Sequence, residues 1–427
     1  MNTEANTKKR SGVAEKGRFT DRPGVRAVLS SLICIVGGLL AGFVVLLLLA
    51  VFSDDVPISD AFAGIMYILG GPFSSGTLSD ILFNLGDMIL EATPLLMTGL
   101  SVAVAFKTGL FNIGAPGQYL IGAMLAMLVG LSVPTTPSTA FWVWLLALLV
   151  GIAGGVIWGA IPGFFKAIFN VNEVIVCIMT NWIAANVVSW VFAASGDRFI
   201  NIAETKTKFL RPTATNGVAT PKLGLDKLFP GSHIDIGFAI AVLIAVLMFI
   251  MLNKTVFGYE LKACGFNKNA AKYSGMSERR NIMLSMMIAG GLAAGGAALW
   301  YLNGQNDMMW NTYSSLPANG FNGIPAALLA GSNPIGVIFS SLFLRYINKG
   351  GFNLAGYTAY NEYVSDLITA VIIYLAGFSR LIGDMLVSRR GKRAVGAAPL
   401  SPGTALDALD AAGKGDAPGA SGTEKGE

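Results

Sequence analysis

Residues 27–52 read AVLSSLICIVGGLLAGFVVLLLLAVF and contain no charged side chain. The run is too long for the hydrophobic core of a signal peptide, and no convincing cleavage site follows it. It has the length that an α-helix needs to cross a bilayer, so we predict that it is the first membrane span. Lysine and arginine are frequent in residues 1–26, which predicts a basic tail in the cytoplasm.

The composition of the whole chain agrees with a membrane protein. Hydrophobic residues make up 53% of the 427 residues and charged residues only 13%, whereas about a quarter of a soluble domain is charged. The apolar runs are long and do not alternate with polar residues, which favours helices over a β-barrel. The predicted fold is therefore all-α, a polytopic integral membrane protein of about ten transmembrane helices with broken or re-entrant segments.

The apolar runs define a transmembrane domain at 27–387. Its spans are expected near 27–52, 86–106, 113–131, 141–165, 174–194, 236–253, 281–302, 321–333, 334–348 and 364–387. Residues 61–72 are either a re-entrant or an interfacial piece, and the run 321–348 is either two short spans or one broken span. An even number of spans returns the C-terminus to the cytoplasm. There the Ala-, Gly-, Asp- and Pro-rich residues 388–427 are expected to form a disordered tail.

Two basic loops flank the predicted span 236–253. Loop 195–235 and segment 254–280 are equally rich in lysine and arginine, so their charge alone does not orient the chain. Counting spans from the N-terminus places 195–235 outside the cell and 254–280 in the cytoplasm, and one span more or fewer would reverse this. Within the second loop, alanines and lysines bounded by glycines predict a short polar helix at 258–275. We expect this helix to contact another molecule rather than only to join two spans.

Glycines recur every four residues at Gly151, Gly155, Gly159 and Gly163. They line one helix face, and small residues at this spacing let two helices approach closely in lipid. Tight packing is the favoured interpretation, and a moving interface is the alternative.

Polar side chains inside predicted spans need a partner or a wet cavity, because a charge at mid-bilayer costs about 2.5–3.5 kcal/mol. Asn84, Asp87 and Glu91 are spaced to share one helix face, and Pro94 is expected to kink the same span.

The glycine- and proline-rich stretch 109–118 cannot be a regular lipid-facing helix. It is either a cavity lining, in which Asn112 and Gln118 offer hydrogen bonds to a polar solute, or a simple interhelical turn near the membrane surface.

Catalytic signatures are missing from the sequence. It has no phosphate-binding loop, so the chain cannot be a P-loop ATPase by itself, and it has no nucleophile elbow, zinc-protease motif or kinase motif. Cys34, Cys177 and Cys264 show no paired spacing, and His233 is the only histidine. The sequence therefore predicts neither catalytic residues nor a metal site.

Several motifs follow one another in a fixed order. They are EATPLLMTGL at 91–100, GLFNIG at 109–114, GQ at 117–118 with IGA at 121–123, NEVIV at 172–176 with MTN at 179–181, and GFNGIPAALL at 320–329. Together they resemble the permease subunits of ABC importers of the ribose, branched-chain amino acid and nucleoside type. The resemblance is strongest to guanosine and general nucleoside permeases that work with binding lipoproteins of the basic-membrane-protein type. Relatives often carry Glu where Pro116 stands, so a charge is not available at that point here.

The resemblance implies a subunit of the bacterial plasma membrane that translocates nucleosides delivered by an extracellular binding lipoprotein. ATP and Mg²⁺ would be bound by a separate ABC ATPase subunit, and no cofactor or nucleic acid would be bound by this chain. A second permease subunit would complete a heterodimer. The segment after the extracellular loop would be the coupling element that docks on the ATPase, through Glu260, Ala263, Gly265, Asn267, Ala270, Ala271 and Gly275.

An uncharged polar solute with a flat ring would suit a membrane path with few charges and several amide and aromatic groups. The candidate wall residues are Phe111, Asn112, Gln118, Asn181, Trp182, Phe321 and Asn322. A pentose sugar or an amino acid is the alternative solute. The alternative classes of protein are a secondary transporter or channel, disfavoured because no ion relay is evident, and a membrane enzyme or anchor, for which no reacting residues are visible.

Overall fold

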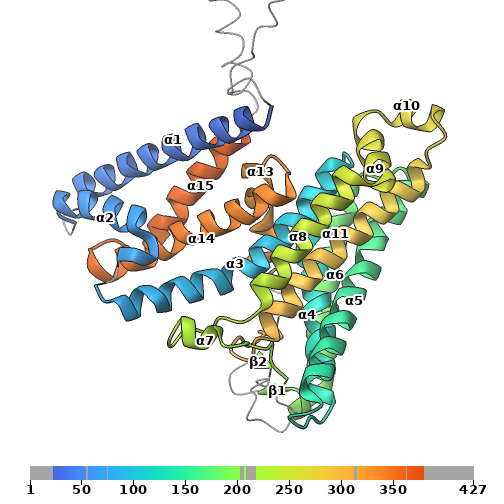
Figure 1. Cartoon of the computed structure of the whole chain (residues 1–427), viewed down its shortest axis with the longest axis horizontal. Coiled ribbons are helices and arrows are strands. Elements are labelled where there is room, and N and C mark those ends of the chain that lie inside the picture. The colour runs from blue at the N-terminus through green and yellow to red at the C-terminus, as the bar shows by residue number, and fades with distance from the viewer. Residues whose placement is uncertain are drawn as a thin grey trace, which may run out of the picture. The chain divides into compact units, whose positions relative to one another are not determined.

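The structure is a computed structural model (Figure 1) that describes residues 23–53, 56–74, 76–201, 206–207, 218–311, 315–361 and 363–378. Helices dominate these residues, as the apolar runs predict. Residues 1–22 of the predicted N-terminal tail and the whole predicted tail 388–427 lie outside the described residues.

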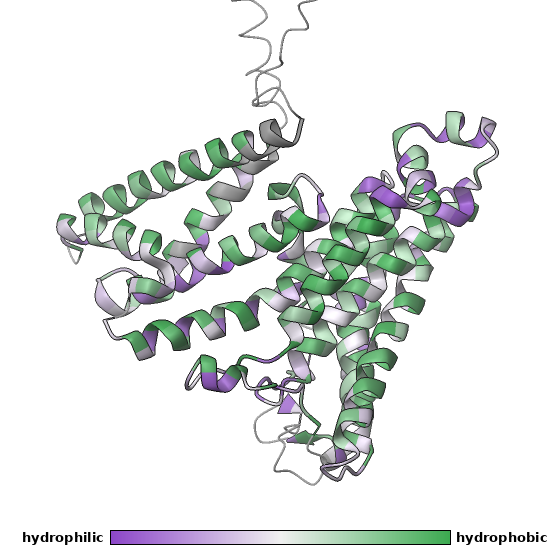
Figure 2. Ribbon diagram, in the orientation of Figure 1, coloured by the Kyte–Doolittle hydropathy of each residue, from purple (hydrophilic) through white to green (hydrophobic). Residues whose placement is uncertain are grey.

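Five of the helices that follow the predicted spans closely form one packed group. They are α4 (Ala115–Ser132), α5 (Ala140–Phe169), α6 (Glu173–Ser195), α8 (Gly237–Lys254) and α11 (Glu278–Tyr301). Their surfaces are mainly apolar along their length in Figure 2. Among the described helices, α5 and α11 share the most extensive contact, and small residues make it.

Gly155 and Gly290 show why small residues are needed at that contact. A methyl group added at Gly155 would overlap Ala294 and the carbonyl oxygen of Gly290, and one added at Gly290 would overlap the carbonyl oxygen of Gly155. The glycine stripe of α5 is therefore a packing surface, in agreement with the favoured interpretation of its spacing.

Helix α3 (Leu78–Lys107) is the hub of the fold, because it packs against α8, α11 and α14 (Pro334–Tyr357). It begins at Thr77, whose hydroxyl accepts a hydrogen bond from the Asp80 backbone N–H at 3.2 Å. The helix continues through Pro94, and the Thr98 hydroxyl donates to the Pro94 carbonyl at 2.8 Å.

A second group of helices contains both ends of the described chain. It consists of α1 (Pro23–Phe52), α2 (Ile58–Gly70), the 3₁₀ turn η2 (Gly71–Ser74), α14 and α15 (Tyr363–Gly377). The predicted re-entrant or interfacial piece 61–72 corresponds to α2 and the start of η2. These two elements pack on α14, where the Tyr346 hydroxyl donates to the Leu69 carbonyl at 2.6 Å.

Helices α1 and α15 run antiparallel side by side. The Cys34 thiol donates to the Leu375 carbonyl at 3.2 Å near one end of the pair, and the Tyr360 hydroxyl donates to the Leu46 carbonyl at 2.7 Å beyond the other end of α15. The start of α1 therefore lies beside the end of α15.

Short elements occupy opposite ends of α8 (Figure 1). Before α8 come the 3₁₀ turn η3 (Gly196–Arg198), the antiparallel strands β1 (Ile200–Asn201) and β2 (Lys206–Thr207), and α7 (Leu225–Leu228). After α8 come α9 (Val256–Phe266) and α10 (Lys268–Tyr273). The two basic loops thus lie at opposite ends of this span, as the sequence requires.

Of the two alternatives for 321–348, the structure has one broken segment and not two separate short spans. The short helices α12 (Ala318–Phe321) and α13 (Gly323–Leu329) bend by 118° against α14. Positive φ angles at Gly331 (59°) and Ser332 (57°) make this break.

Within the described residues, seven helices are long and apolar enough to cross a membrane, and the bent pair is an eighth candidate. Of the predicted span 364–387, the structure describes residues up to 378, with α15 as its helix. The predicted number of ten spans is not reached in the described residues.

Candidate functional site

The stretch 109–118 is an interior turn held by its own amides. Asn112 Nδ2 donates to Gln118 Oε1 at 2.8 Å and to Ser101 Oγ at 2.9 Å, while Gln118 Nε2 donates back to Asn112 Oδ1 at 3.1 Å. Both side chains are almost completely buried. Their hydrogen bonds therefore stabilise the turn and are not directed toward a solute.

Asn181 fastens α6 to the same turn. Its Oδ1 accepts from the Gly117 backbone N–H at 2.9 Å, and its Nδ2 donates to the Ile113 carbonyl at 2.9 Å. A methyl group at Gly117 would come within 2.8 Å of Asn181 Oδ1, so glycine is required for this approach. Of the two interpretations of 109–118, the structure supports an interhelical turn, but one buried inside the protein.

The other predicted wall residues lie apart from these three amides. The Phe111 ring stacks on Phe106 with a centroid distance of 5.3 Å. Trp182 is half-exposed on an apolar face of α6, and Phe321 and Asn322 lie at the junction of α12 and α13. The contacts of the described residues thus bring together Asn112, Gln118 and Asn181, but they do not gather all seven around one cavity.

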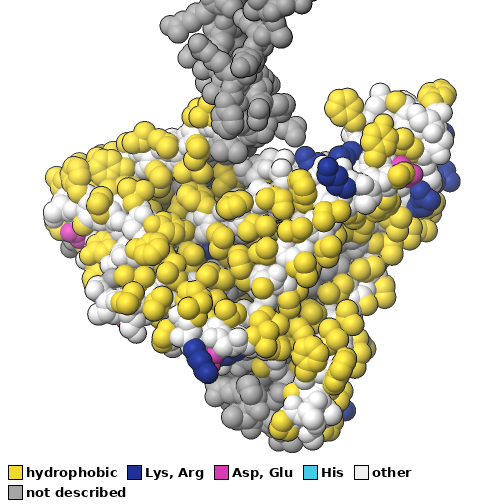
Figure 3. Space-filling model, viewed as in Figure 1, with side chains coloured by type: hydrophobic (Ala, Val, Ile, Leu, Met, Phe, Trp, Pro, Cys, Tyr) yellow, Lys and Arg dark blue, Asp and Glu magenta, His cyan; other side chains and the backbone are white. Residues whose placement is uncertain are grey.

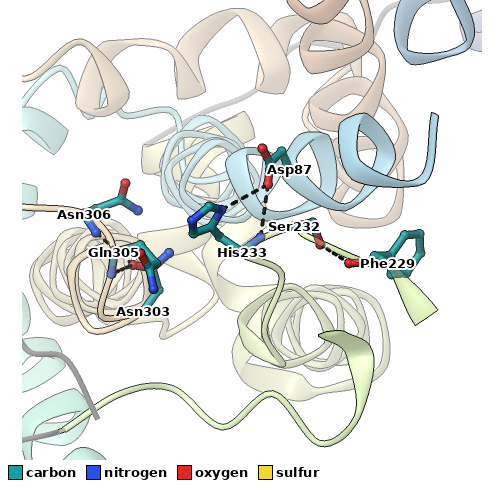
Figure 4. Close-up of polar contacts among 7 residues, drawn as sticks. All are labelled: Asp87, Phe229, Ser232, His233, Asn303, Gln305 and Asn306. Atoms are coloured by element: carbon teal, nitrogen blue, oxygen red, sulfur yellow. Dashed lines mark hydrogen bonds and ion pairs between the residues drawn. The ribbon is translucent and has the colours of Figure 1, made fainter. Parts of the chain in front are cut away.

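A polar cavity of about 200 Å³ lies instead against the polar face of α3 that the sequence indicates. Asp87 accepts from the His233 backbone N–H at 3.2 Å, and its carboxylate lies 3.8 Å from His233 Nδ1. His233 lies between Asp87 and the turn at 303–306 in Figure 4. The cavity, which we call the outer cavity, is lined by Asp87, Leu90, Glu91, His233, Trp300, Asn303, Gln305 and Asn306.

Asn303 holds the turn that borders the outer cavity. Its Oδ1 accepts from the backbone N–H groups of Gln305 (2.8 Å) and Asn306 (3.1 Å), as Figure 4 shows. Its side chain is only 3% exposed, and among the described residues its Nδ2 has no hydrogen-bond partner. The oxygen of Asn303 thus holds the turn at 303–306, and its buried nitrogen is a costly group that the described residues leave unsatisfied.

A second cavity of about 310 Å³ lies between α3, α14 and α15, and we call it the inner cavity. It is lined by Glu91, Arg345, Asn348, Lys349, Phe352, Tyr363 and Asp366. Glu91 lines both cavities, so they meet at this carboxylate.

The polar groups of the inner cavity are partly engaged with one another. Arg345 Nη2 donates to Asn319 Oδ1 at 3.0 Å, and Arg345 Nη1 lies 3.8 Å from the Glu91 carboxylate. Asn348 Nδ2 donates to Asp366 Oδ1 at 3.2 Å. The inner cavity therefore contains both acidic and basic groups that can form hydrogen bonds.

Sequence reasoning missed the inner cavity except for Glu91. Arg345, Asn348, Lys349 and Phe352 fall at i, i+3, i+4 and i+7, so they share one face of α14. That spacing, together with charges next to an apolar run, was the signal that could have identified them. Asp366 could not be added from sequence, because only the fold brings α15 beside α14.

The predicted coupling segment is the two short helices α9 and α10. The Glu260 carboxylate accepts from Arg280 Nη2 at 2.9 Å and from Asn281 Nδ2 at 3.2 Å, which joins α9 to the start of α11. Asn267 caps α10, accepting from the Ala270 backbone N–H at 3.0 Å.

Two of the predicted contact residues face the chain itself. A methyl group at Gly265 would come within 2.6 Å of the Lys107 carbonyl oxygen, so Gly265 is packed against the end of α3. Ala271 is buried. Both residues therefore support the segment from inside, Ala271 as a buried residue and Gly265 as a partly buried one.

The outer surface of the segment is exposed and contains aromatic rings. Asn267, Ala270 and Gly275 are exposed, while Glu260 and Ala263 are half-buried. Phe266 is 97% exposed and Tyr273 is 93% exposed, which the sequence analysis did not single out. Lysine and arginine side chains gather at this end of the face seen in Figure 3. Exposed aromatic rings among positive charges are typical of a docking surface.

Comparison with known protein families decides the class of the chain. The family described as the branched-chain amino acid transport system permease component matches residues 84–377. The chain belongs to this family. It is therefore a multi-pass membrane permease, a transport component rather than an enzyme.

Individual relatives cover most of the permease. It is 33% identical to the guanosine ABC transporter permease protein NupP of Bacillus subtilis, over 83% of this chain and 94% of NupP. It is 32% identical to the nucleoside ABC transporter permease protein NupB of Lactococcus lactis, over 86% of this chain and 96% of NupB. It is also 27% identical to the glucose ABC transporter permease protein TsgB13 of Haloferax volcanii, over 73% of this chain and 82% of TsgB13.

A second guanosine permease of Bacillus subtilis, NupQ, also resembles the chain, at 24% identity over 60% of this chain and 78% of NupQ. Two permeases of that organism are thus described for guanosine. No solved structure gives a significant match.

Proposed function

We propose that this permease is a transmembrane subunit of an ATP-driven ABC importer for nucleosides, which an extracellular binding lipoprotein delivers. The observation that supports this best is the identity of about one third, over nearly the whole length, to relatives described as guanosine and nucleoside permeases. A glucose permease is also a relative, so a sugar is the second candidate solute.

The partners follow from the same proposal. ATP and Mg²⁺ are bound by a separate ATPase subunit, since this sequence has no phosphate-binding loop. Because both NupP and NupQ resemble the chain, a second permease subunit is expected to complete a heterodimer. In this assignment both termini and the segment 254–280 lie in the cytoplasm of a bacterial cell, and loop 195–235 lies outside.

The packing of α9 suggests how ATP binding moves the membrane helices. Glu260 ties α9 to Arg280 at the start of α11, and Gly265 seats the end of α9 against Lys107 at the end of α3. Movement of the segment by the ATPase is thus passed to two long helices, one of which carries Glu91 between the two cavities. ATP must favour one arrangement of these helices over the other, or transport cannot be driven.

The experiment measures uptake of radiolabelled uridine and guanosine in cells that lack their own nucleoside importers. The permease is expressed with and without the ATPase, binding lipoprotein and second permease of the same transporter. Uptake that requires the ATPase supports the proposal, and uptake by this chain alone would contradict it. Glucose, ribose and amino acids are measured in the same cells to decide the solute.

The coupling role is tested with Glu260→Ala. We expect uptake to be lost, because α9 loses its ionic link to α11, while capture of solute by the binding lipoprotein is unchanged. The matched control is Asp226→Ala, which removes an exposed carboxylate from α7 at the other end of α8. Normal uptake in Glu260→Ala would contradict the coupling assignment.

A further inference from the structure

The inner cavity carries balanced charges. Its lining has two carboxylates, Glu91 and Asp366, and two cations, Arg345 and Lys349. An anionic or cationic solute would find as much repulsion as attraction there, and it would also lose its hydration. The lining therefore favours a solute that is uncharged but rich in hydrogen-bonding groups.

Several of these groups have unused hydrogen-bonding capacity. The 3.8 Å distance between Arg345 Nη1 and the Glu91 carboxylate is too long for a hydrogen bond. A hydroxyl group placed between them can accept from the guanidinium and donate to the carboxylate. The gap between these two side chains fits a solute that has several hydroxyl groups.

Aromatic rings complete the lining. Phe352 is 62% exposed and Tyr363 is 68% exposed, although both line the cavity. Lys349 Nζ lies 5.5 Å from the centre of the Phe352 ring, so a cation lies over the face of this ring. A flat, polar ring system can stack on such side chains, as nucleobases do on aromatic residues.

We propose that the inner cavity binds the solute within the membrane domain, and that it recognises an uncharged ring compound with several hydroxyl groups and a flat aromatic face, such as a nucleoside. This inference rests on the proposed importer function, and it adds the place and the chemistry of solute binding. The hydroxyl groups are held by Glu91 and Arg345 and by the Asn348–Asp366 pair, and the flat ring lies against Phe352 and Tyr363. The cavity volume of about 310 Å³ is within the range of small-molecule sites.

The outer cavity leads to this site. It contacts the turn at 303–306 and His233, which precedes α8, and it shares Glu91 with the inner cavity. With loop 195–235 outside the cell, a solute enters past Asp87 and His233 and meets Glu91 before it reaches Arg345.

The test uses the complete transporter in proteoliposomes, with its ATPase, second permease and binding lipoprotein. Uptake of uridine and stimulation of ATP hydrolysis by the loaded lipoprotein are measured separately. The variant is Phe352→Ala, and the matched control is Phe339→Ala, which removes an equally exposed phenyl ring from the same helix outside the cavity. Phe352→Tyr keeps an aromatic face and should retain uptake.

We expect uridine uptake by Phe352→Ala to fall about five- to hundredfold relative to Phe339→Ala, as for loss of one base–aromatic stack. ATPase stimulation should stay within about twofold, because the coupling segment is untouched. Equal uptake in the two variants would overturn the proposal. If Phe352→Ala also loses ATPase stimulation, Asn348→Ala decides: reduced uptake with normal stimulation supports the site, and unchanged uptake overturns it.

Failure of the proposed function would look different. An unaltered transporter that takes up no nucleoside, while its ATPase responds to another loaded solute, would contradict the nucleoside assignment and with it the solute chemistry proposed here. Normal nucleoside uptake in the unaltered transporter and in Phe352→Ala alike would overturn the inner cavity alone.

Discussion

Asp235 is a buried carboxylic acid just before α8, outside the membrane-spanning segment. Its Oδ1 accepts from the Gly237 backbone N–H at 2.7 Å, while among the described residues its Oδ2 has no partner. Burial raises its pKa to about 7, although the Gly237 hydrogen bond and the charge of Lys222 oppose this rise. Below about pH 7 the neutral acid is thus the main form in the folded protein.

The pKa of Asp235 predicts a stability that falls as the pH rises. Above pH 4 the unfolded carboxyl has lost its proton, whereas the folded one keeps it up to about pH 7, so unfolding releases a proton in this window. The thermal midpoint of the purified permease should therefore decrease between pH 4 and pH 7. Asp235→Asn should flatten this decrease, while Asp226→Asn, at an exposed position, should not. An unchanged pH profile in Asp235→Asn would contradict the prediction.

Single residues also show what could not be predicted from the sequence. Asn112, Gln118 and Asn181 are polar residues in apolar surroundings, and such residues serve equally well to bind a solute or to hold a turn. Which role applies depends on whether their partners are already present, and these partners are residues of other helices or the backbone. The residue type indicated burial of a hydrogen-bonding group, but only the tertiary contacts identified the group that satisfies it.

At the scale of helices, the contact between α5 and α11 depends on glycine. Gly155→Ala should separate the two helices, because its methyl group has no space between Ala294 and the Gly290 carbonyl. Overpacking of this kind costs about 1–3 kcal/mol. We expect less monodisperse protein by fluorescence-detected size exclusion and a lower thermal midpoint. Gly356→Ala, on α14 with no atom within 4 Å of the added methyl group, is the control that should behave as the unaltered chain.

Helices were predicted best where apolar runs were long and uninterrupted. The observed bounds of α4, α5, α6, α8 and α11 follow the predicted spans closely, because a helix hides its own backbone hydrogen bonds from lipid. The run 321–348 was predicted as either two short spans or one broken span, and the fold has the broken form because α13 packs against α3 and α14. Gly331, Asn333 and Pro334 marked the break, but the 118° bend depends on contacts with α3 and α14.

At the scale of the assembled transporter, the exposed rings of α9 and α10 predict a docking surface. Tyr273→Ala should weaken co-purification of the ATPase with the permease, because exposed aromatic residues often contribute more than about 1–2 kcal/mol to binding. Tyr374→Ala, which removes a 69% exposed tyrosine from α15, is the control. Equal recovery of the ATPase with both variants would show that Tyr273 does not contact it.

At the scale of the whole molecule, the sequence was least informative about the proposed solute site. Glu91 on α3 was recognised as polar, but its companions in the inner cavity come from α14 and α15, far along the chain. The order of the motifs identified the family, because that order is read from the sequence alone. The inner cavity could be recognised only in the folded structure, since residues of three separate helices must come together before their charges balance.

The antiparallel pair of α1 and α15 has a consequence for cross-linking. The Cys34 thiol on α1 lies beside the Leu375 carbonyl near the end of α15, at 3.2 Å. A cysteine introduced at Leu375 would therefore lie close enough to Cys34 to be joined to it by a short bifunctional reagent within a single molecule. That cross-link would report the packing of the two helices without disturbing either cavity.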